Sequence, residues 1–151
     1  MLLLLLAACP TTKPDSSDTS STDTSGALPG PTGPATVSND CAPDDGSAVT
    51  FDIGVETASC SASSAGLPHA RITIYQAVPL AAGTYAFGDS GTGGAWFSDD
   101  GTAEMAVTEG TLTVDTWGST VTGSYELTVQ GGETYAGTFD GVECTVKIVC
   151  G

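Results

Sequence analysis

A one-for-one alternation of apolar and polar residues runs through much of the chain after residue 48, and no other feature constrains the fold so strongly. In residues 49–55 every second side chain is apolar, and residues 121–129 repeat the pattern with one glycine among the apolar positions. Because successive side chains of a strand point to opposite faces, this period predicts strands with one buried face. No segment shows the 3.6-residue period of an amphipathic helix. The sequence therefore predicts an all-β fold.

Short strands at close spacing are typical of a single antiparallel β-sandwich or a small β-barrel, and the pattern does not decide between them. Gly, Asp and Ser fill the breaks between the strands, where turns need these residues. Glu109 and Gly110 interrupt the alternation and predict a turn or a bulge. The predicted strands cover residues 49–55, 71–78, 85–87, 105–107, 111–117, 121–129, 135–139 and 144–150.

The N-terminus carries an export signal. Five leucines follow Met1 and lead to Ala-Ala-Cys at residues 7–9. Such an apolar run is typical of a secretory signal peptide and is much shorter than the roughly 20 residues of a transmembrane helix. No Lys or Arg precedes the leucines, which indicates that the native signal begins further upstream.

The stretch Leu-Ala-Ala-Cys at residues 6–9 resembles the lipobox of bacterial lipoproteins. The resemblance implies that residues 1–8 are removed and that Cys9 is acylated, which makes a membrane the first partner of this chain. Acyl chains hold a protein to a bilayer because each buried methylene contributes about 0.8 kcal/mol. The residue after Cys9 is not Asp, and in that family this implies the outer membrane. The expected location is therefore the cell envelope, outside the cytoplasm.

Residues 9–38 are rich in Ser, Thr, Pro and Asp, and Leu28 and Val37 are their only large apolar side chains. Such a segment buries too little apolar surface to offset the loss of chain entropy, so it predicts a disordered tether. The β-rich domain is accordingly expected to span residues 39–151.

Four cysteines follow the tether, and outside the cytoplasm an even set indicates disulfides. If the β-branched residues 145–149 are extended, Cys144 and Cys150 lie about 20 Å apart and cannot bond to each other. Each must then pair with Cys41 or Cys60. If the strands that these cysteines flank are antiparallel neighbours, the pairs are Cys41–Cys150 and Cys60–Cys144, with the crossed pairing as the alternative.

Acidic side chains outnumber basic ones 18 to 3, which gives a formal charge of −15. This balance excludes nucleic acid as a partner, because few cations are available to replace the counterions around phosphates. Hard cations favour carboxylates and loop carbonyls. Asp99, Asp100 and Glu104, around Gly101, therefore form a candidate calcium site, whose alternative is a solvated acidic turn. No other cofactor is expected.

Trp96 and Phe97 are adjacent, so any strand would place one ring on each face. An exposed ring on a sheet can stack on a sugar or on a protein, which makes this pair the candidate partner site. The chain has one histidine, His69, and its spacing to Asp52 or Asp99 indicates no catalytic arrangement. We therefore expect a non-enzymatic lipoprotein that binds a protein or glycan or is structural; the alternative is a small extracytoplasmic hydrolase.

Overall fold

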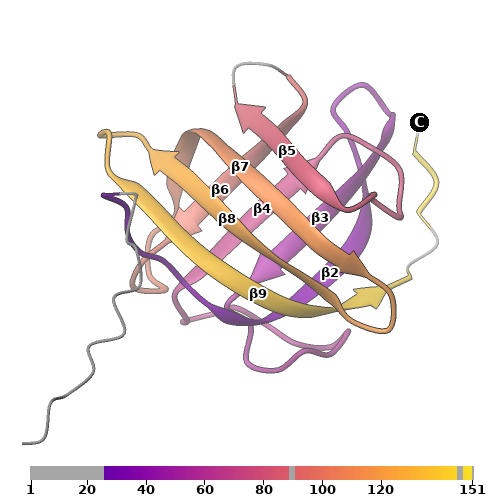
Figure 1. Cartoon of the computed structure of the whole chain (residues 1–151), viewed down its shortest axis with the longest axis horizontal. Helices are drawn as coiled ribbons and strands as arrows, with labels where there is room; N and C mark the ends of the chain where they lie inside the picture. Colours follow the sequence, from indigo (N-terminus) through magenta and orange to yellow (C-terminus); the bar gives the residue numbers. More distant parts are fainter. Residues whose placement is uncertain (1–25, 89–90, 146–147, 151) are drawn as a thin grey trace, which may run out of the picture.

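The computed structural model describes residues 26–88, 91–145 and 148–150, and these residues form nine β-strands (Figure 1). The strands are β1 (Leu28–Pro29), β2 (Gly33–Cys41), β3 (Ser47–Ile53), β4 (His69–Ile74), β5 (Gly83–Gly88), β6 (Gly93–Ser98), β7 (Met105–Trp117), β8 (Val121–Val129) and β9 (Thr134–Cys144). The all-β prediction is confirmed. Within the described ranges, no helix is long and apolar enough to span a membrane.

Seven strands close into a barrel in the order β2-β3-β4-β6-β7-β8-β9, because β9 pairs with β2 as well as with β8. All neighbours in this ring are antiparallel except β2 and β9, which run parallel. The two extra strands extend existing pairings: β1 lies along β9 ahead of β2, and β5 lies along β7 beyond β6. Of the two predicted architectures, the chain therefore adopts the barrel, in which closure removes most free strand edges.

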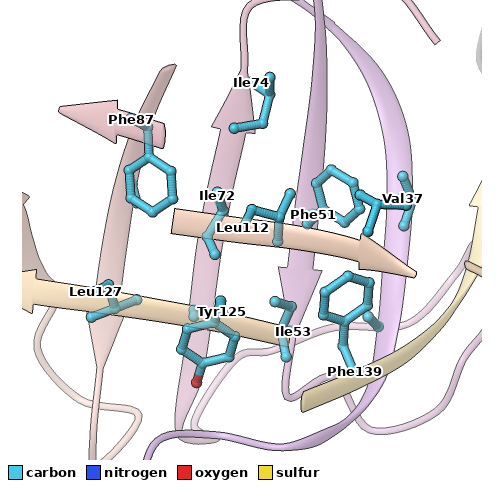
Figure 2. Close-up of a cluster of buried hydrophobic side chains, with 14 of the residues drawn as sticks. Val37, Phe51, Ile53, Ile72, Ile74, Phe87, Leu112, Tyr125, Leu127 and Phe139 are labelled. Atoms are coloured by element: carbon cyan, nitrogen blue, oxygen red, sulfur yellow. The ribbon is translucent and has the colours of Figure 1, made fainter. Parts of the chain in front are cut away.

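The inward side chains of the barrel form one core (Figure 2). Phe51 lies at its centre, with its ring 5.5 Å from that of Phe139 and 6.1 Å from that of Trp117, both edge to face. Leu112 on β7 and Leu127 on β8 are fully buried in the same core. These residues occupy the apolar positions of the alternating pattern, so hydrophobic periodicity and burial coincide.

The structure corrects the predicted start of the folded domain. β2 begins at Gly33, and its inward residues Ala35 and Val37 have no exposed surface. Residues 33–38 therefore belong to the barrel and not to the tether. Composition missed this strand because its inward side chains are few and small, while β3 and β9 on either side supply hydrogen bonds and bulk. Cys9 and the tether up to residue 25 lie outside the described residues.

The described residues do not show the predicted strand at 144–150. β9 ends at Cys144, and among the residues after it Thr145 and 148–150 are described and lie outside any strand. The β2–β9 ladder ends where Ser38 pairs with Cys144, although β2 itself continues beside β3 to Cys41. The strong β propensity of this segment therefore does not produce a strand.

Two further differences concern the middle of the chain. β6 was not predicted, because the glycines at its start hide the alternation. The predicted strands at residues 105–107 and 111–117 are one strand, β7, whose pairing with β8 shifts register between Val107 and Glu109. This irregularity adjoins the predicted break at Glu109 and Gly110, and it corresponds to a bulge and not to a turn.

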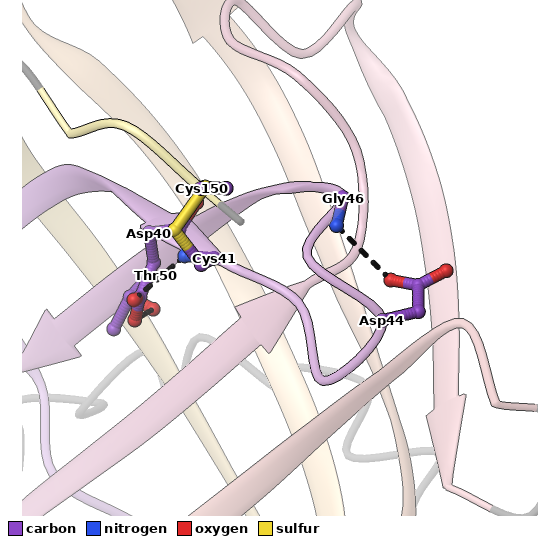
Figure 3. The surroundings of a disulfide bond; sticks show 6 residues. All are labelled: Asp40, Cys41, Asp44, Gly46, Thr50 and Cys150. Atoms are coloured by element: carbon purple, nitrogen blue, oxygen red, sulfur yellow. Dashed lines mark hydrogen bonds between the residues drawn. A yellow bond between two sulfur atoms is a disulfide. The ribbon is translucent and has the colours of Figure 1, made fainter.

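Two disulfides are present, Cys41–Cys150 with a Cα–Cα distance of 5.6 Å and Cys60–Cys144 with 5.4 Å. They are the pairs that the sequence predicts, although the tail that carries Cys150 is not a strand. The first bond holds this tail to the end of β2, beside the turn that leads into β3 (Figure 3). The second holds the long β3–β4 loop, residues 54–68, against the end of β9.

Candidate functional site

One row of side chains crosses the outer surface of β2, β3, β4 and β6. Strand register places Thr36 beside Asp52, Asp52 beside Arg71, and Arg71 beside Trp96. All four residues occupy outward positions, because their neighbours along each strand point into the core. We call the outer surface of these four strands the polar face.

Trp96 is the aromatic side chain that the barrel presents to solvent on this face, with 50% of its surface exposed. Its neighbour Phe97 has no exposed surface, and its ring lies 4.3 Å from that of Tyr135 in the core. The prediction that one ring of the pair faces each side of a strand is therefore correct. Phe97, however, is wrong as a partner-binding residue, because the core buries it.

Arg71 and Asp52 form an ion pair next to this ring. Arg71 Nε donates to Asp52 Oδ1 at 2.6 Å, and the two side chains are 48% and 21% exposed. This hydrogen bond raises the pKa of Arg71 above its ordinary value. Asp52 is thus engaged by Arg71, and the ring nitrogens of His69 lie beside other groups.

A small cleft of about 150 Å³ opens beside the ion pair. Thr36, Asp52 and Arg71 form its floor, and Ser63 and Ser64 of the β3–β4 loop form its wall. The Cys60–Cys144 disulfide holds this loop in place a few residues before the two serines. Because ligand pockets usually reach 300–1,000 Å³, this cleft suits one small polar group of a larger ligand.

His69 also occupies an outward position on β4, but it is nearly buried. Its Nδ1 lies 2.8 Å from the carbonyl oxygen of Leu67, and its Nε2 lies 3.4 Å from Glu104 Oε1. Both partners are acceptors, so the ring satisfies them together only when both nitrogens carry hydrogen. In the described part of the chain no hydroxyl contacts this ring, and Asp99 does not either.

The residues of the predicted calcium site do not converge. The Asp100 carboxylate accepts hydrogen bonds from Thr102 N and Thr102 Oγ1 at 2.8 and 2.7 Å, which lower its pKa. Glu104 points instead to His69. Among the described residues, no group of three or more His, Cys, Asp or Glu side chains could hold a metal. The structure therefore does not assemble the predicted calcium site at Asp99, Asp100 and Glu104, because turn hydrogen bonds hold Asp100 and Glu104 lies beside His69.

Sequence reasoning missed a larger groove at one end of the polar face. It has a volume of about 730 Å³ and lies between the β2–β3 turn and the segments around Tyr75 and Thr92. Tyr75 directly follows β4 and comes two residues after the outward Thr73, and its hydroxyl lies beside Gly94 on the same face. The groove itself depends on segments far apart in the sequence and has no local signal.

No protein-family model matches this chain, and comparison with curated proteins and with solved structures finds no match either.

Proposed function

We propose that this protein is a non-enzymatic lipoprotein of the cell envelope whose barrel binds a glycan through Trp96 on the polar face. The exposed Trp96 ring beside the Arg71–Asp52 pair is the observation that carries the proposal. A sugar ring combines an apolar C–H face with hydroxyl groups around its edge. The indole can stack on the C–H face, while guanidinium donors and carboxylate acceptors bind the hydroxyl groups.

A glycan fits this surface better than a protein does. Protein interfaces bury about 800 Å² on each partner and usually centre on several apolar side chains. On the polar face, Trp96 has Arg71 and Ala106 as its cross-strand partners, so its ring is the one large apolar surface there that is half exposed; Tyr75 is partly buried and carries a hydroxyl. One ring with charged and hydroxyl groups around it matches a sugar.

Two observations support the envelope location. The lipobox-like residues 6–9 begin the chain, and both disulfides need an oxidising compartment to persist. We expect the mature protein to begin at an acylated Cys9, and the mass of the protein purified from membranes checks this. Cys9→Ser should remove the added mass and release the protein into the soluble fraction. An unmodified Cys9 in a chain that retains residues 1–8 would contradict the anchor.

Substitution of the exposed ring tests the glycan site. We expect Trp96→Ala to weaken binding to glycans found on an array by about fivefold to tenfold, since one lost stacking contact is worth about 1–1.4 kcal/mol. Trp96→Phe should retain part of the affinity, because a smaller ring still stacks. Leu28→Ala is the matched control, since Leu28 is an exposed apolar residue on β1, away from the polar face. Isothermal titration calorimetry measures all three variants.

Two outcomes would overturn the proposal. One is the absence of binding to any glycan by the wild-type protein, and the other is equal binding by wild type and Trp96→Ala. Bound sugar must also remain intact during long incubation. Cleavage that His69→Ala abolishes would favour the hydrolase instead.

A further inference from the structure

We propose that the binding site is elongated, running from Trp96 to Tyr75, and that its ligand is an uncharged oligosaccharide of at least three linked rings. This inference rests on the proposed glycan-binding function and names the class of glycan. Three observations carry it: the two rings share one face, the floor between them is low, and a groove continues the site.

The two rings lie on the same side of the sheet. Arg71, Thr73 and Tyr75 are successive outward positions, and at about 3.3 Å per residue Arg71 and Tyr75 are about 13 Å apart. Trp96 pairs with Arg71, so its backbone lies a similar distance from that of Tyr75. The Tyr75 side chain extends back along the face toward Trp96, because its hydroxyl lies beside Gly94. The Tyr75 backbone nitrogen donates to the Thr92 carbonyl at 2.9 Å, which keeps this residue beside the start of β6 although β4 itself ends at Ile74.

Gly94 makes the floor between the rings low. It pairs with Thr73 and occupies the outward position two residues before Trp96. A Cβ atom at Gly94 would lie 3.5 Å from the Tyr75 hydroxyl, which places that hydroxyl on the outer surface beside Gly94. Any larger side chain here would stand between Tyr75 and Trp96.

A chain of hydroxyl contacts makes the same floor polar and rigid. The Thr50 hydroxyl donates to Asp40 Oδ2 at 2.7 Å and lies 2.8 Å from Thr73 Oγ1 (Figure 3 shows the first contact). Asp40 Oδ1 in turn accepts from the Cys41 backbone nitrogen at 2.8 Å. The carboxylate thus fixes Thr50, and Thr50 fixes Thr73 beside Gly94, where a sugar hydroxyl would lie.

The groove of about 730 Å³ extends the site beyond Tyr75. Its far wall is the β2–β3 turn, in which Gly46 N donates to Asp44 Oδ1 at 3.2 Å (Figure 3). This volume lies in the range of ligand pockets, unlike the cleft of about 150 Å³ at the Trp96 end. The ligand must therefore be long enough to reach from the indole to the groove.

The charge of the face decides against acidic glycans. Asp40, Asp44, Asp52 and Glu104 border the site, Arg71 is the basic side chain among them, and the whole chain carries −15. Such a field repels uronic-acid or sulfated chains. Neutral sugar hydroxyls do not experience this repulsion, and they can donate hydrogen bonds to the carboxylate oxygens.

Chain length is the variable that tests the inference. The probes are β-1,4-linked glucose oligomers and β-1,4-linked N-acetylglucosamine oligomers of one to six units, titrated into the wild-type protein by calorimetry. We expect affinity for one of the two series to rise about tenfold or more between the disaccharide and the tetrasaccharide, as the second ring becomes engaged. Polygalacturonate should bind at least tenfold more weakly than the neutral chain.

Two variants locate the second contact. Tyr75→Ala should abolish the rise in affinity between the disaccharide and the tetrasaccharide and leave the disaccharide affinity unchanged. Gly94→Leu should do the same by adding bulk between the rings, so a folding defect in one variant does not remove the test. Leu28→Ala again serves as the control, and circular dichroism melting curves establish that each variant is folded.

The outcomes separate this inference from the proposed function. Binding that depends on Trp96 but not on chain length or Tyr75 would overturn the elongated site and leave the glycan function intact. Absence of binding to every glycan tested would overturn both. Equal affinity for polygalacturonate would overturn the preference for uncharged chains. Salt-sensitive binding of a basic protein such as cytochrome c, lost in both Trp96→Ala and Tyr75→Ala, would replace the oligosaccharide with a protein partner.

Discussion

Single side chains tie the N-terminal segment to the barrel wall. The Tyr125 hydroxyl donates to the Pro31 carbonyl at 2.7 Å, across 94 positions of sequence. Its ring is almost fully buried, and burial raises the pKa of the phenol well above its ordinary value near 10. A neutral Tyr125 is therefore part of the folded state.

This raised pKa makes stability depend on pH in the alkaline range. Below about pH 10 the phenol keeps its proton in both states, and its contribution to stability is constant. Above that pH the unfolded chain releases the proton while the folded chain retains it, so the free energy of unfolding falls as pH rises. We expect the free energy of unfolding of Tyr125→Phe to fall less steeply with pH than that of the wild type. Urea titrations between pH 8 and pH 11 measure both slopes. Equal slopes would contradict this assignment.

Among the elements, the β3–β4 loop is the one that links stability to the candidate site. Its residues 54–68 connect two neighbouring strands by a long path over the outside of the barrel. Ser63 and Ser64 line the cleft beside Arg71, and Cys60 bonds the loop to Cys144. This disulfide joins segments that are 84 positions apart in the sequence. The position of the loop against the barrel therefore depends strongly on it.

We therefore expect the double variant Cys60→Ser, Cys144→Ser to lose both stability and affinity. In the chain-entropy account, a loop of this length corresponds to roughly 4–5 kcal/mol in the free energy of unfolding. Glycan affinity should also fall, because the cleft wall is no longer held. The matched control is Cys41→Ser, Cys150→Ser, which should lose a similar free energy and leave the cleft beside Arg71 intact. Denaturant titration and calorimetry report the two effects separately.

At the scale of the whole molecule, the first and last segments close the barrel. β2 and β9 pair in parallel from Gly33 to Ser38, and this ladder joins the two ends of the ring. Figure 1 shows the described N-terminal segment leaving at one end of β9 and the C-terminal segment at the other. Closure therefore requires nearly the full length of the folded chain.

Truncation tests that requirement. We expect a chain that begins at Gly26 to unfold cooperatively and a chain that begins at Asn39 not to fold. The second chain lacks most of β2, which exposes one edge each of β3 and β9 and opens the core around Phe51. Thermal unfolding followed by circular dichroism distinguishes the two. A sharp transition at the same temperature in both chains would show that residues 26–38 are dispensable.

The local sequence pattern was sufficient to predict properties that belong to a single strand, such as its position and the face to which each side chain points. Alternation in residues 49–55 and 121–129 predicted strands with one buried face, and the adjacency of Trp96 and Phe97 predicted one outward ring. Both follow because a strand turns successive side chains to opposite sides, whatever its neighbours are. Distance along the chain also excluded Cys144–Cys150. The choice between the two remaining pairings was correct, but it assumed antiparallel neighbours, whereas β3 pairs with β2 and β4.

Other properties depended on which strands meet, and pairing between distant segments leaves no local mark in a sequence. Ala35 and Val37 are buried only because β3 and β9 flank them, whereas Thr145, Ile148 and Val149, which are also β-branched, lie outside any strand. Likewise, the sequence around Tyr75 or Trp96 does not predict that these two residues lie on the same face of the barrel. Strand register decided that, since hydrogen bonds between strands, and not residue preferences, determine which side chains become neighbours.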